Sequence, residues 1–360
     1  MQISKLATRA GEWLKGEGRD ADIVVSSRIR LARNITDFPF MSKVSPGQRG
    51  ELEQLLRGKI LSIDVPRELL YLGLAELPGV DRLFLVERHL ISREHASGEG
   101  ERGVAFDEAE SLSIMTNEED HLRMQSIRSG FELEQTWQAL DHVDTMLEKE
   151  LNYAFHSRFG YLTACPTNVG TGMRVSVMLH LPALVSTRHL DKVVNAVAKI
   201  NLVVRGLYGE GTEASGDFYQ ISNQVTLGKA ETDIIDSVLN AIPRVITYER
   251  KARETLMAEN RKQIEDRVWR AYGILKVARS ISSEETLHLI SQVRMGVHLG
   301  ILKNVDLKTV NELFVLTLPA HLQKLAGREI EPEERNVERA DFVRRKLAGS
   351  QDLQEEKPDV

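Results

Sequence analysis

The interpretation of this chain starts from the sequence Cys165-Pro-Thr-Asn-Val-Gly-Thr-Gly-Met-Arg174. It contains the only cysteine of the chain, two glycines in a short turn and an arginine directly beyond the turn. Glycine lets backbone N–H groups approach phosphate oxygens closely, and a following arginine can clamp them with a planar, permanently charged guanidinium. By itself the pattern is also typical of an ordinary surface turn. The rest of the chain decides between the two interpretations.

The composition is that of a globular protein with a sizeable core. A chain of 360 residues, 42% hydrophobic and 28% charged, allows two domains and argues against a fibre or a disordered protein. The net charge of −6 argues against a nucleic-acid coat, and no apolar run has the length of a membrane span or of a signal peptide. A single cysteine excludes intrachain disulfides and cysteine-rich zinc sites. We expect a cytoplasmic protein that holds no metal by its own ligands and binds neither membrane nor nucleic acid directly.

The first two thirds of the chain predict mainly strands. Alternation over residues 22–33 indicates a strand that carries Arg28 and Arg30 on one face. Further strands are expected over residues 83–86, 174–181, 201–205 and 218–227. Helices are expected after Ser45, over 131–156 and over 187–200.

Residues 112–127 contain the acidic sequence Asn117-Glu-Glu-Asp-His-Leu-Arg123. The apolar start of this run favours a strand, on which Glu119 and Arg123 would point to the same side. A helix would also bring these two residues together, at positions i and i+4. Both alternatives therefore predict that Glu119 pairs with Arg123.

From Thr232 onward the periodicity is almost wholly helical. Ser282 begins a capping box and Asp306 is a second N-cap signal. The apolar stripes of this region, which include Leu287 and Leu313, fit either a core or a dimer interface. We expect a homodimer.

Strands that are followed by helices indicate an α+β catalytic domain and a separate helical domain. We place the catalytic domain at residues 1–255 and an all-helical C-terminal domain at 256–349. Residues 350–360 are polar and acidic, which predicts a disordered tail.

The strand-rich region contains arginines beside glycines or carboxylates: Arg28, Arg30, Arg123, Arg174 and Arg205. Any one of them alone is typical of a solvated surface residue. A protein that neutralises a triphosphate without a P-loop lysine needs several guanidinium groups, because they are planar, bidentate and permanently charged. The chain has neither a Gly-x-x-x-x-Gly-Lys-Ser/Thr sequence nor a protein-kinase His-Arg-Asp loop. The arginines are therefore candidate phosphate ligands.

A second group of candidate residues is acidic and comprises Glu118-Glu119-Asp120 and Glu210 with Glu213. The alternative is a solvated charge run. Carboxylates on two sides suit a guanidinium substrate, which is cationic, planar and a poor nucleophile while it is protonated. They can orient it by paired hydrogen bonds, and one can accept its proton as the N–P bond forms. Cys165 is either a small buried apolar residue or a reactive thiol.

Five blocks together resemble the signature of the phosphagen (guanidino) kinases, in the order that this family shows. They are Ser-Ser-Arg28-Ile-Arg30, Asn117-Glu-Glu-Asp-His-Leu-Arg123, Cys165-Pro-Thr-Asn-x-Gly-Thr-Gly-x-Arg174, Arg205-Gly-x-x-Gly-Glu210-x-Thr-Glu213 and Tyr219-x-Ile-Ser-Asn223. The resemblance implies an antiparallel β-sheet flanked by helices and ATP-dependent phosphorylation of a guanidino nitrogen with Mg²⁺. It implies that the five arginines bind the nucleotide phosphates. It also implies that Glu119, Glu210, Glu213 and Cys165 contact the guanidinium, with Cys165 as a thiolate and Glu119 or Glu210 as the base.

The departures from that pattern resemble one branch, the bacterial protein arginine kinases of the McsB type. Phosphagen kinases carry an N-terminal helical domain before the Arg28 block, and here an extra helical domain follows the catalytic one instead. An open site of this kind suits an arginine on a protein surface. The branch binds phosphoarginine through an Arg-Asp-x-x-Arg-Ala sequence, which Arg335-Asn-Val-Glu-Arg339-Ala340 matches except at Asn336. The alternative for this segment is an ordinary charged helix. Phe106 and Met178 stand where the family has histidines near adenine.

The leading hypothesis is a protein arginine kinase that transfers the γ-phosphoryl group of ATP to exposed arginines of proteins. The resemblance implies that the product directs proteins to the Clp protease machinery in the stress response. It also implies an activator of the McsA type and a heat-shock repressor as a target. One alternative is a small-molecule guanidino (arginine) kinase, against which the missing N-terminal domain argues. Another is a non-catalytic phosphoarginine-binding adaptor, against which the complete arginine–glutamate set argues.

Overall fold

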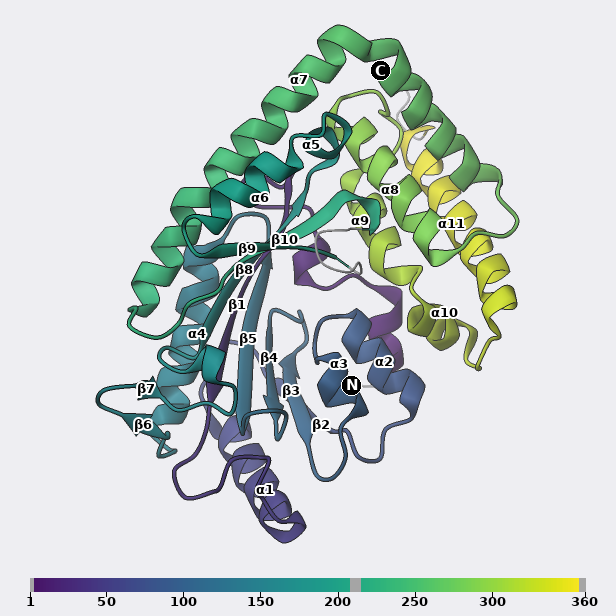
Figure 1. Cartoon of the computed structure of the whole chain (residues 1–360). Helices are drawn as coiled ribbons and strands as arrows, with labels where there is room; N and C mark the ends of the chain where they lie inside the picture. The colour runs from purple at the N-terminus through teal and green to yellow at the C-terminus, as the bar shows by residue number, and fades with distance from the viewer. Residues whose placement is uncertain (1–2, 208–214, 356–360) are drawn as a thin grey trace.

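The computed structural model describes residues 3–207 and 215–355, which form an antiparallel β-sheet flanked by helices (Figure 1). The strand order in the eight-stranded sheet is β2-β3-β4-β5-β1-β8-β10-β9. Its strands are β1 (Val24–Arg33), β2 (Leu69–Gly73), β3 (Gly103–Asp107), β4 (Leu112–Thr116), β5 (Leu122–Ser129), β8 (Met173–His180), β9 (Leu202–Gly206) and β10 (Phe218–Asn223). The predicted α+β class is confirmed. A separate hairpin consists of β6 (Phe155–His156) and β7 (Gly160–Tyr161).

The α-helices of the described residues crowd the last third of the chain, as the sequence predicts. They are α1 (Pro46–Ser62), α2 (Gly79–Glu87), α3 (Arg93–Ser97), α4 (Leu133–Glu148), α5 (Pro182–Ser186), α6 (Leu190–Ala198), α7 (Glu231–Val277), α8 (Ser283–His298), α9 (Leu307–Leu316), α10 (Pro319–Ala326) and α11 (Pro332–Glu355). Short 3₁₀ helices are η1 (Ile3–Thr8), η2 (Glu12–Leu14), η3 (Pro166–Asn168) and η4 (Ser215–Asp217). Ser282 and Asp306 cap α8 and α9 by accepting hydrogen bonds from Glu285 N and Thr309 N.

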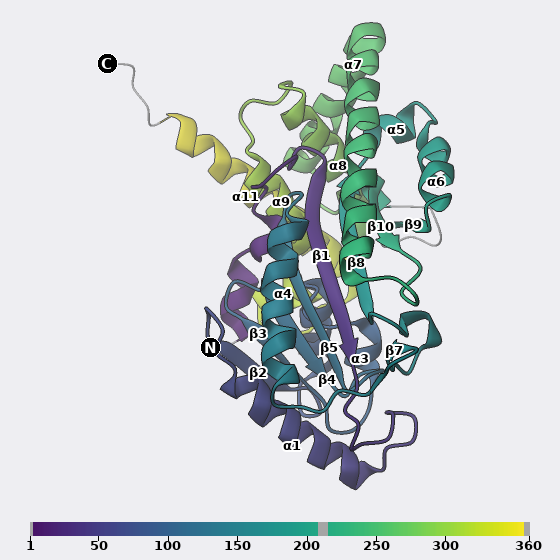
Figure 2. The ribbon, with the colours of Figure 1, turned by 90° about the vertical axis from the view of Figure 1, so that its left-hand side faces the viewer.

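The two faces of the sheet have different partners because successive side chains of a strand alternate between them. Ile29, Leu31 and Val175 point into a core that α1, α4, α6 and the first half of α7 cover. Figure 2 shows α4 and α7 running along this face. The opposite face carries Arg28 and Arg30, and it is covered only in part, by α2 and by the helices after α7.

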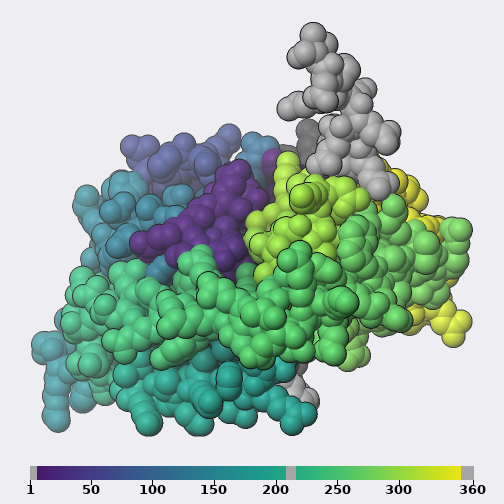
Figure 3. Space-filling model, turned by 90° about the horizontal axis from the view of Figure 1, so that it is seen from above, coloured from purple at the N-terminus to yellow at the C-terminus, as the bar shows by residue number. Residues whose placement is uncertain are grey.

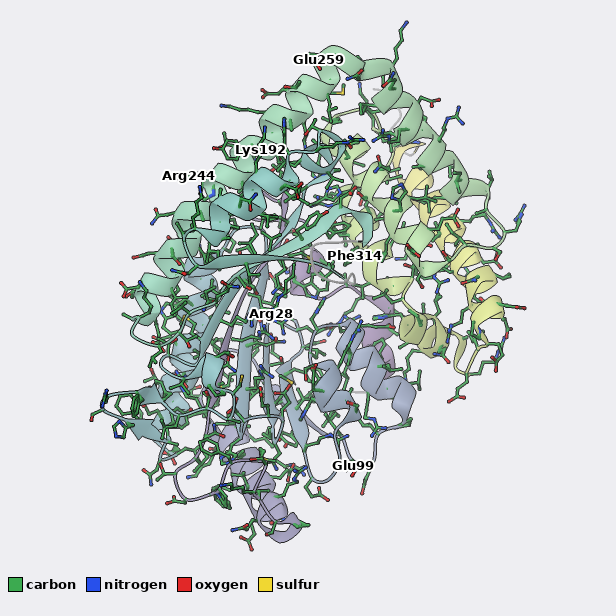
Figure 4. The ribbon with its side chains drawn as sticks, in the orientation of Figure 1. Arg28, Glu99, Lys192, Arg244, Glu259 and Phe314 are labelled. Carbon is green, nitrogen blue, oxygen red and sulfur yellow. The ribbon has the colours of Figure 1, made fainter. Side chains whose placement is uncertain are left out.

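Helix α7 connects the sheet to the helical region. Val238 of its first half belongs to the core under the sheet, whereas Val268 of its second half belongs to the core of the helical region. Asn260, with φ −132° and ψ 28°, interrupts the helix between the two halves. Figure 4 labels Glu259 at this bend. The predicted domain boundary at residue 255 therefore lies inside one helix, close to its bend.

The helical region also contacts the N-terminal segment. Trp13 of η2 is 1% exposed and packs edge-on against Phe314 of α9. Arg294 of α8, itself buried, donates hydrogen bonds to the carbonyl oxygens of Ala21 at 2.8 Å and Asp22 at 3.1 Å. Figure 3 shows the N-terminal residues in purple against the yellow-green surface of the helical region. The segment before β1 thus ties the helical region to the sheet.

Three predicted elements differ from the structure. Residues 83–86, for which the apolar run predicts a strand, lie in α2, where Phe84 and Leu85 are buried. A short apolar run is compatible with a buried strand and with a buried helix, so its pattern does not separate them. The helix predicted over 131–156 ends at Glu148. Helix α11 continues to Glu355 and so includes the first residues of the predicted tail.

Candidate active site

The five predicted phosphate-binding arginines lie on one face of the sheet. Arg30 is opposite Arg174 in the pairing of β1 with β8, and Arg28 lies two residues away on the same face. The register of β5 against β1 places Arg123 on this face, and that of β9 against β10 places Arg205 there as well. Figure 4 shows Arg28 at the centre of the molecule. Residues that are far apart in the sequence thus form a single basic surface.

The guanidinium groups of this surface repel one another. Burial, followed by the charges of Arg123 and Arg174, lowers the pKa of Arg28 to about 10. Burial and the same neighbours, together with Arg28, lower the pKa of Arg30 well below its ordinary value. Burial, Arg205 and Arg123 lower the pKa of Arg174. Because uncompensated buried cations are costly, the arrangement suits a polyanionic ligand such as a triphosphate.

Glu119 lies in the tight turn between β4 and β5. Asn117, with a φ of 57°, allows the turn, and its N–H donates to His121 O at 2.9 Å. The Glu119 side chain is 45% exposed, and its Oε2 lies 3.9 Å from Arg123 Nη2. Glu118 is 2% exposed and makes the closer ion pair with Arg123. Arg123 therefore has two carboxylate neighbours, and the exposed one is accessible to a substrate.

The pKa of Glu119 is raised above its ordinary value, first of all by burial. Burial raises the pKa of Glu119, and the adjacent Asp120 and Glu118 raise it further, while Arg123 opposes the shift. A carboxylate with a raised pKa binds a proton more strongly than an ordinary one. Glu119 therefore has the exposure and the basicity that a proton acceptor needs.

Asp120 joins the Glu119 turn to the loop that carries Cys165. Its side chain is wholly buried, and Oδ1 accepts hydrogen bonds from Asn34 Nδ2 at 2.6 Å and from Ala164 N at 2.7 Å. Asp120 is the neighbour of Glu119 in sequence, and Ala164 is the neighbour of Cys165. One buried carboxylate therefore holds the two predicted substrate-contacting segments at the same end of the sheet.

The glycines of the Cys165 loop serve close backbone packing. A Cβ at Gly170 would lie 2.5 Å from Thr226 O, and the residue has a φ of 114°. Gly172, with a φ of 62°, lies equally close to the backbone of β1. Both N–H groups already have partners, since Gly170 N donates to Tyr161 O and Gly172 N to Asn168 O. The N–H groups of both glycines therefore stabilise the loop itself, which favours the turn interpretation of these two residues over a phosphate cradle.

Comparison with known proteins supports the same interpretation. The model of the ATP:guanido phosphotransferase C-terminal catalytic domain matches residues 51–252, and that of the protein-arginine kinase McsB C-terminal domain matches residues 261–358. The protein-arginine kinase of Symbiobacterium thermophilum is 50% identical over 353 residues, which cover 97% of this chain and 100% of that protein. The chain belongs to the protein-arginine kinase family. The relative from Moorella thermoacetica is 48% identical and covers 95% of this chain and 98% of its own length.

Solved structures of a taurocyamine kinase and a lombricine kinase resemble the fold of this chain. The duplicated taurocyamine kinase from Schistosoma mansoni, with bound transition state analog components, is 30% identical with a TM-score of 0.58. The match covers 70% of this chain and 35% of that duplicated chain. The lombricine kinase crystal structure is 25% identical with a TM-score of 0.57, over 68% of this chain and 70% of that one. The resemblance to phosphagen kinases is confirmed.

The remaining predicted site residues are Glu210, Glu213, Arg335 and Arg339. Glu210 and Glu213 lie outside the described residues. Arg339 is 1% exposed and donates to Thr317 O at 2.8 Å and to Asn336 Oδ1 at 2.7 Å. Asn336 is the position at which the sequence departs from the expected phosphoarginine-binding pattern, and its side-chain oxygen accepts a hydrogen bond from Arg339. Arg335 is half-buried on the same helix, α11.

His89 is a site residue that the sequence did not reveal. It lines a cleft of 1820 Å³ together with Arg28 and Arg30. Burial, with the charges of these two arginines, lowers the pKa of His89 to about 3, so the imidazole is neutral. Its buried Nε2 has no hydrogen-bond partner among the described residues. A lone histidine after an apolar run carries no signal of its own, and its position became visible only when α2 was seen beside the sheet.

Phe106 and Met178, which the sequence resemblance predicts to stand in place of histidines near adenine, are both buried. Phe106 is 1% exposed and packs in the cluster under α2. Met178 is 6% exposed and packs with Phe218 and with Leu287 of the helical region.

Proposed function

We propose that the chain is an ATP-dependent protein arginine kinase, which transfers the γ-phosphoryl group of ATP to the guanidino group of arginine residues in proteins. The observation that carries this proposal is the arginine face of the sheet, with Glu119 and Cys165 at one end of it. A polyanion and a cation can occupy adjacent positions there. Family membership supports the same reaction.

In this mechanism Arg28, Arg30 and Arg174 bind the triphosphate. Glu119 orients the substrate guanidinium and accepts its proton while the guanidino nitrogen attacks the γ-phosphorus. The N–P bond forms as the bond between the γ-phosphorus and the bridging oxygen breaks, and ADP leaves. The guanidinium groups stabilise the charge that develops on the transferred phosphoryl group. Glu210 and Glu213 would complete the guanidinium site, and Cys165 would lie against the substrate.

Mg²⁺ would enter this site with ATP. Among residues 3–207 and 215–355 no group of three or more His, Cys, Asp or Glu side chains is arranged to hold a metal ion. Mg²⁺ usually keeps several waters and is bound largely by the phosphates of its nucleotide, so such a protein cage is not required. When bound, Mg²⁺ supplies positive charge to the phosphate oxygens.

A comparison of acceptors tests the proposal. The chain is incubated with ATP and either an arginine-rich protein or free arginine, under conditions that preserve acid-labile N–P bonds. We expect phosphate on the protein and little on free arginine. Comparable efficiency on free arginine would establish a small-molecule guanidino kinase instead. Binding of phosphoarginine without any transfer would establish an adaptor.

We also propose a cytoplasmic homodimer whose product the Clp protease machinery recognises. An McsA-type protein would activate it, and a heat-shock repressor would be one target. Phosphorylation converts a cation to an acidic group, a change that a partner can read. Arg335 and Arg339 would bind phosphoarginine, and the match to the McsB C-terminal domain supports this assignment. None of the helices that the structure describes is both long and apolar enough to cross a membrane.

A further inference from the structure

We infer that the helical region forms one wall of the nucleotide site and contacts the ribose and base of ATP. This inference rests on the proposed function, because it takes ATP as the ligand. It goes beyond that function because the match to the catalytic-domain model ends at residue 252, whereas the wall consists of residues further along the chain.

The first observation is the cleft that opens from the arginine face. Its volume is 1820 Å³, and Arg28 and Arg30 line one side of it. Ser283 and Leu287 of α8, with Pro319 of α10, line the other side. In Figure 4, Phe314 lies on the side of Arg28 toward these helices. The cleft is therefore shared between the sheet and the helical region.

The second observation is the direction of the site along β1. At the end of β1, Arg33 pairs with Leu122, which follows the Glu119 turn, and Leu31 pairs with Met173, which follows the Cys165 loop. The acceptor groups therefore lie at the C-terminal end of β1. At its other end, Val25 belongs to the apolar cluster that contains Leu287. Arg28 and Arg30 lie between the two ends.

This order fixes the orientation of ATP. Phosphoryl transfer places the attacking and leaving oxygen or nitrogen atoms roughly in line with the γ-phosphorus. With the acceptor beyond Arg30, at the Glu119 turn, the leaving ADP must extend past Arg28 toward Val25. The distance from Arg30 to Val25 along a strand is about 16 Å. The ribose and base then lie where the helical region closes the cleft.

The wall is held rigidly against the sheet. Gly216, with a φ of 72°, approaches α8 so closely that a Cβ would lie 2.6 Å from Leu287 O. Ser291 Oγ donates to Asp217 Oδ2 at 3.0 Å. Glu87, which also lines the cleft, accepts hydrogen bonds from the first N–H groups of α10 at 2.8 and 3.0 Å. A wall fixed in this way requires little reorganisation when a ligand binds.

The chemistry of the cleft fits a nucleoside next to the phosphates. His89 is half-buried beside Arg28 and Arg30, and its buried Nε2 has no hydrogen-bond partner among the described residues. Burial and the two arginines lower the pKa of His89 to about 3, so a neutral polar side chain lies next to the phosphate-binding arginines. Leu287 and Pro319 supply apolar surface for a base, and Ser283 supplies a hydroxyl. Pockets for small molecules typically combine apolar walls with a few polar groups in this way.

Filling the cleft from the helical side tests the inference. Ser283→Trp places a large ring at the first position of α8, and Lys308→Trp adds the same ring on α9, outside the cleft, as the matched control. Binding of ATP and of inorganic triphosphate to each full-length variant is measured by calorimetry. We expect Ser283→Trp to weaken ATP binding about tenfold and to leave triphosphate binding unchanged. Lys308→Trp should bind both ligands as the unaltered chain does.

ATP affinity that is unchanged in Ser283→Trp would overturn the inference, and so would equal weakening of ATP and triphosphate. If Ser283→Trp does not fold, as thermal unfolding would show, Glu284→Trp supplies the same test from the next position. The proposed function is tested separately, by arginine phosphorylation with the unaltered chain. If the unaltered chain binds ATP normally but does not phosphorylate arginine, the proposed function is wrong and the inference about the helical wall still holds. If Ser283→Trp binds ATP normally, the inference is wrong and the proposed function still holds.

Discussion

At the scale of single residues, the proposal that Glu119 is the catalytic base can be tested directly. A glutamine at this position keeps the size of the side chain but cannot accept the proton. We expect Glu119→Gln to lower the rate of arginine phosphorylation by a factor of about 10² to 10⁴, with ATP binding retained. ATP binding and turnover are measured on the same preparation. Undiminished phosphorylation by this variant would assign the proton to another group.

The pH profile gives a second readout of the same residue. The base acts in its deprotonated form, and the pKa of Glu119 is raised above the ordinary value of 4.5. The rate should therefore fall as the pH drops through a value above 4.5, rather than at or below it. The residual rate of Glu119→Gln should not show this decrease at low pH.

Cys165 either interacts with the substrate or only packs in its loop, and a substitution separates the two roles. Its Sγ lies 3.0 Å from Thr167 Oγ1, and its side chain is only partly buried. If the sulfur interacts with the cationic substrate as a thiolate, a serine that stays neutral will lose that attraction. We expect Cys165→Ser to lower turnover about tenfold, equivalent to about 1.4 kcal/mol, with unchanged thermal stability. Full activity in Cys165→Ser would mean that the thiol only packs.

At the scale of elements, the turn between β4 and β5 and the loop before β8 depend on Asp120. Asp120→Ala leaves Ala164 N and the Asn34 amide without their buried acceptor. We expect it to cost about 1–3 kcal/mol of unfolding free energy and to lower turnover. Asp120→Asn keeps an acceptor oxygen and should lie between the two proteins in both measurements. A fully stable and active Asp120→Ala would show that other contacts hold these segments together.

The arginine face should show a conflict between stability and binding. Since the guanidinium groups repel one another without a ligand, Arg28→Met should stabilise the ligand-free protein, by about 1 kcal/mol. The same change should weaken ATP binding. Thermal unfolding with and without ATP measures both effects, and Arg345→Met on the exposed side of α11 is the control. If Arg28→Met is less stable than the unaltered chain in the absence of ATP, the hydrogen bond of Arg28 with Gln125 contributes more than the repulsion costs.

The same scale shows which elements a sequence pattern can predict. The strands β1, β8, β9 and β10 overlap the predicted segments, although β10 ends at Asn223. The alternation is clearest in β1, where the half-buried Arg28 and Arg30 flank the buried Ile29. The α2 segment was predicted wrongly because a short apolar run fits a buried strand as well as a buried helix, and its packing against the sheet and α10 is not visible in the run itself.

At the scale of the whole molecule, buried neutral histidines make stability depend on pH. Burial is the first cause of a lowered pKa at His89, His95, His121, His180, His298 and His321. The folded-state pKa lies below the unfolded value of 6.5, so the unfolded chain binds more protons as the pH falls below 6.5. Stability contributed by these groups is present above that pH and is lost as the pH decreases.

We therefore expect the free energy of unfolding to fall as the pH decreases from 7 to 5.5. The decrease is up to about 1.4 kcal/mol per pH unit for each histidine that stays neutral in the folded protein and is protonated in the unfolded chain. Urea unfolding at several pH values measures the slope. His298→Gln removes one group whose pKa is lowered to about 3, and it should reduce the slope. Substitution of the exposed His142 should leave it unchanged. A slope of zero in the unaltered protein would contradict this prediction.

The sequence by itself determined the family, the chemistry of the substrate pair and the order of strands before helices. These properties reside in residue types and short spacings, such as the arginines of β1 or the glutamates of the Asn117 block, which a linear pattern preserves. Only the tertiary structure decided that Glu118, rather than Glu119, makes the closer ion pair with Arg123. It also decided that Asp120 joins the Glu119 turn to the Cys165 loop. The position of His89 beside the arginines likewise became visible only in the folded molecule. The physical reason is that strand register and helix docking bring together residues that are far apart in the chain. For the same reason, only the folded molecule places the helical region over the cleft beside Arg28.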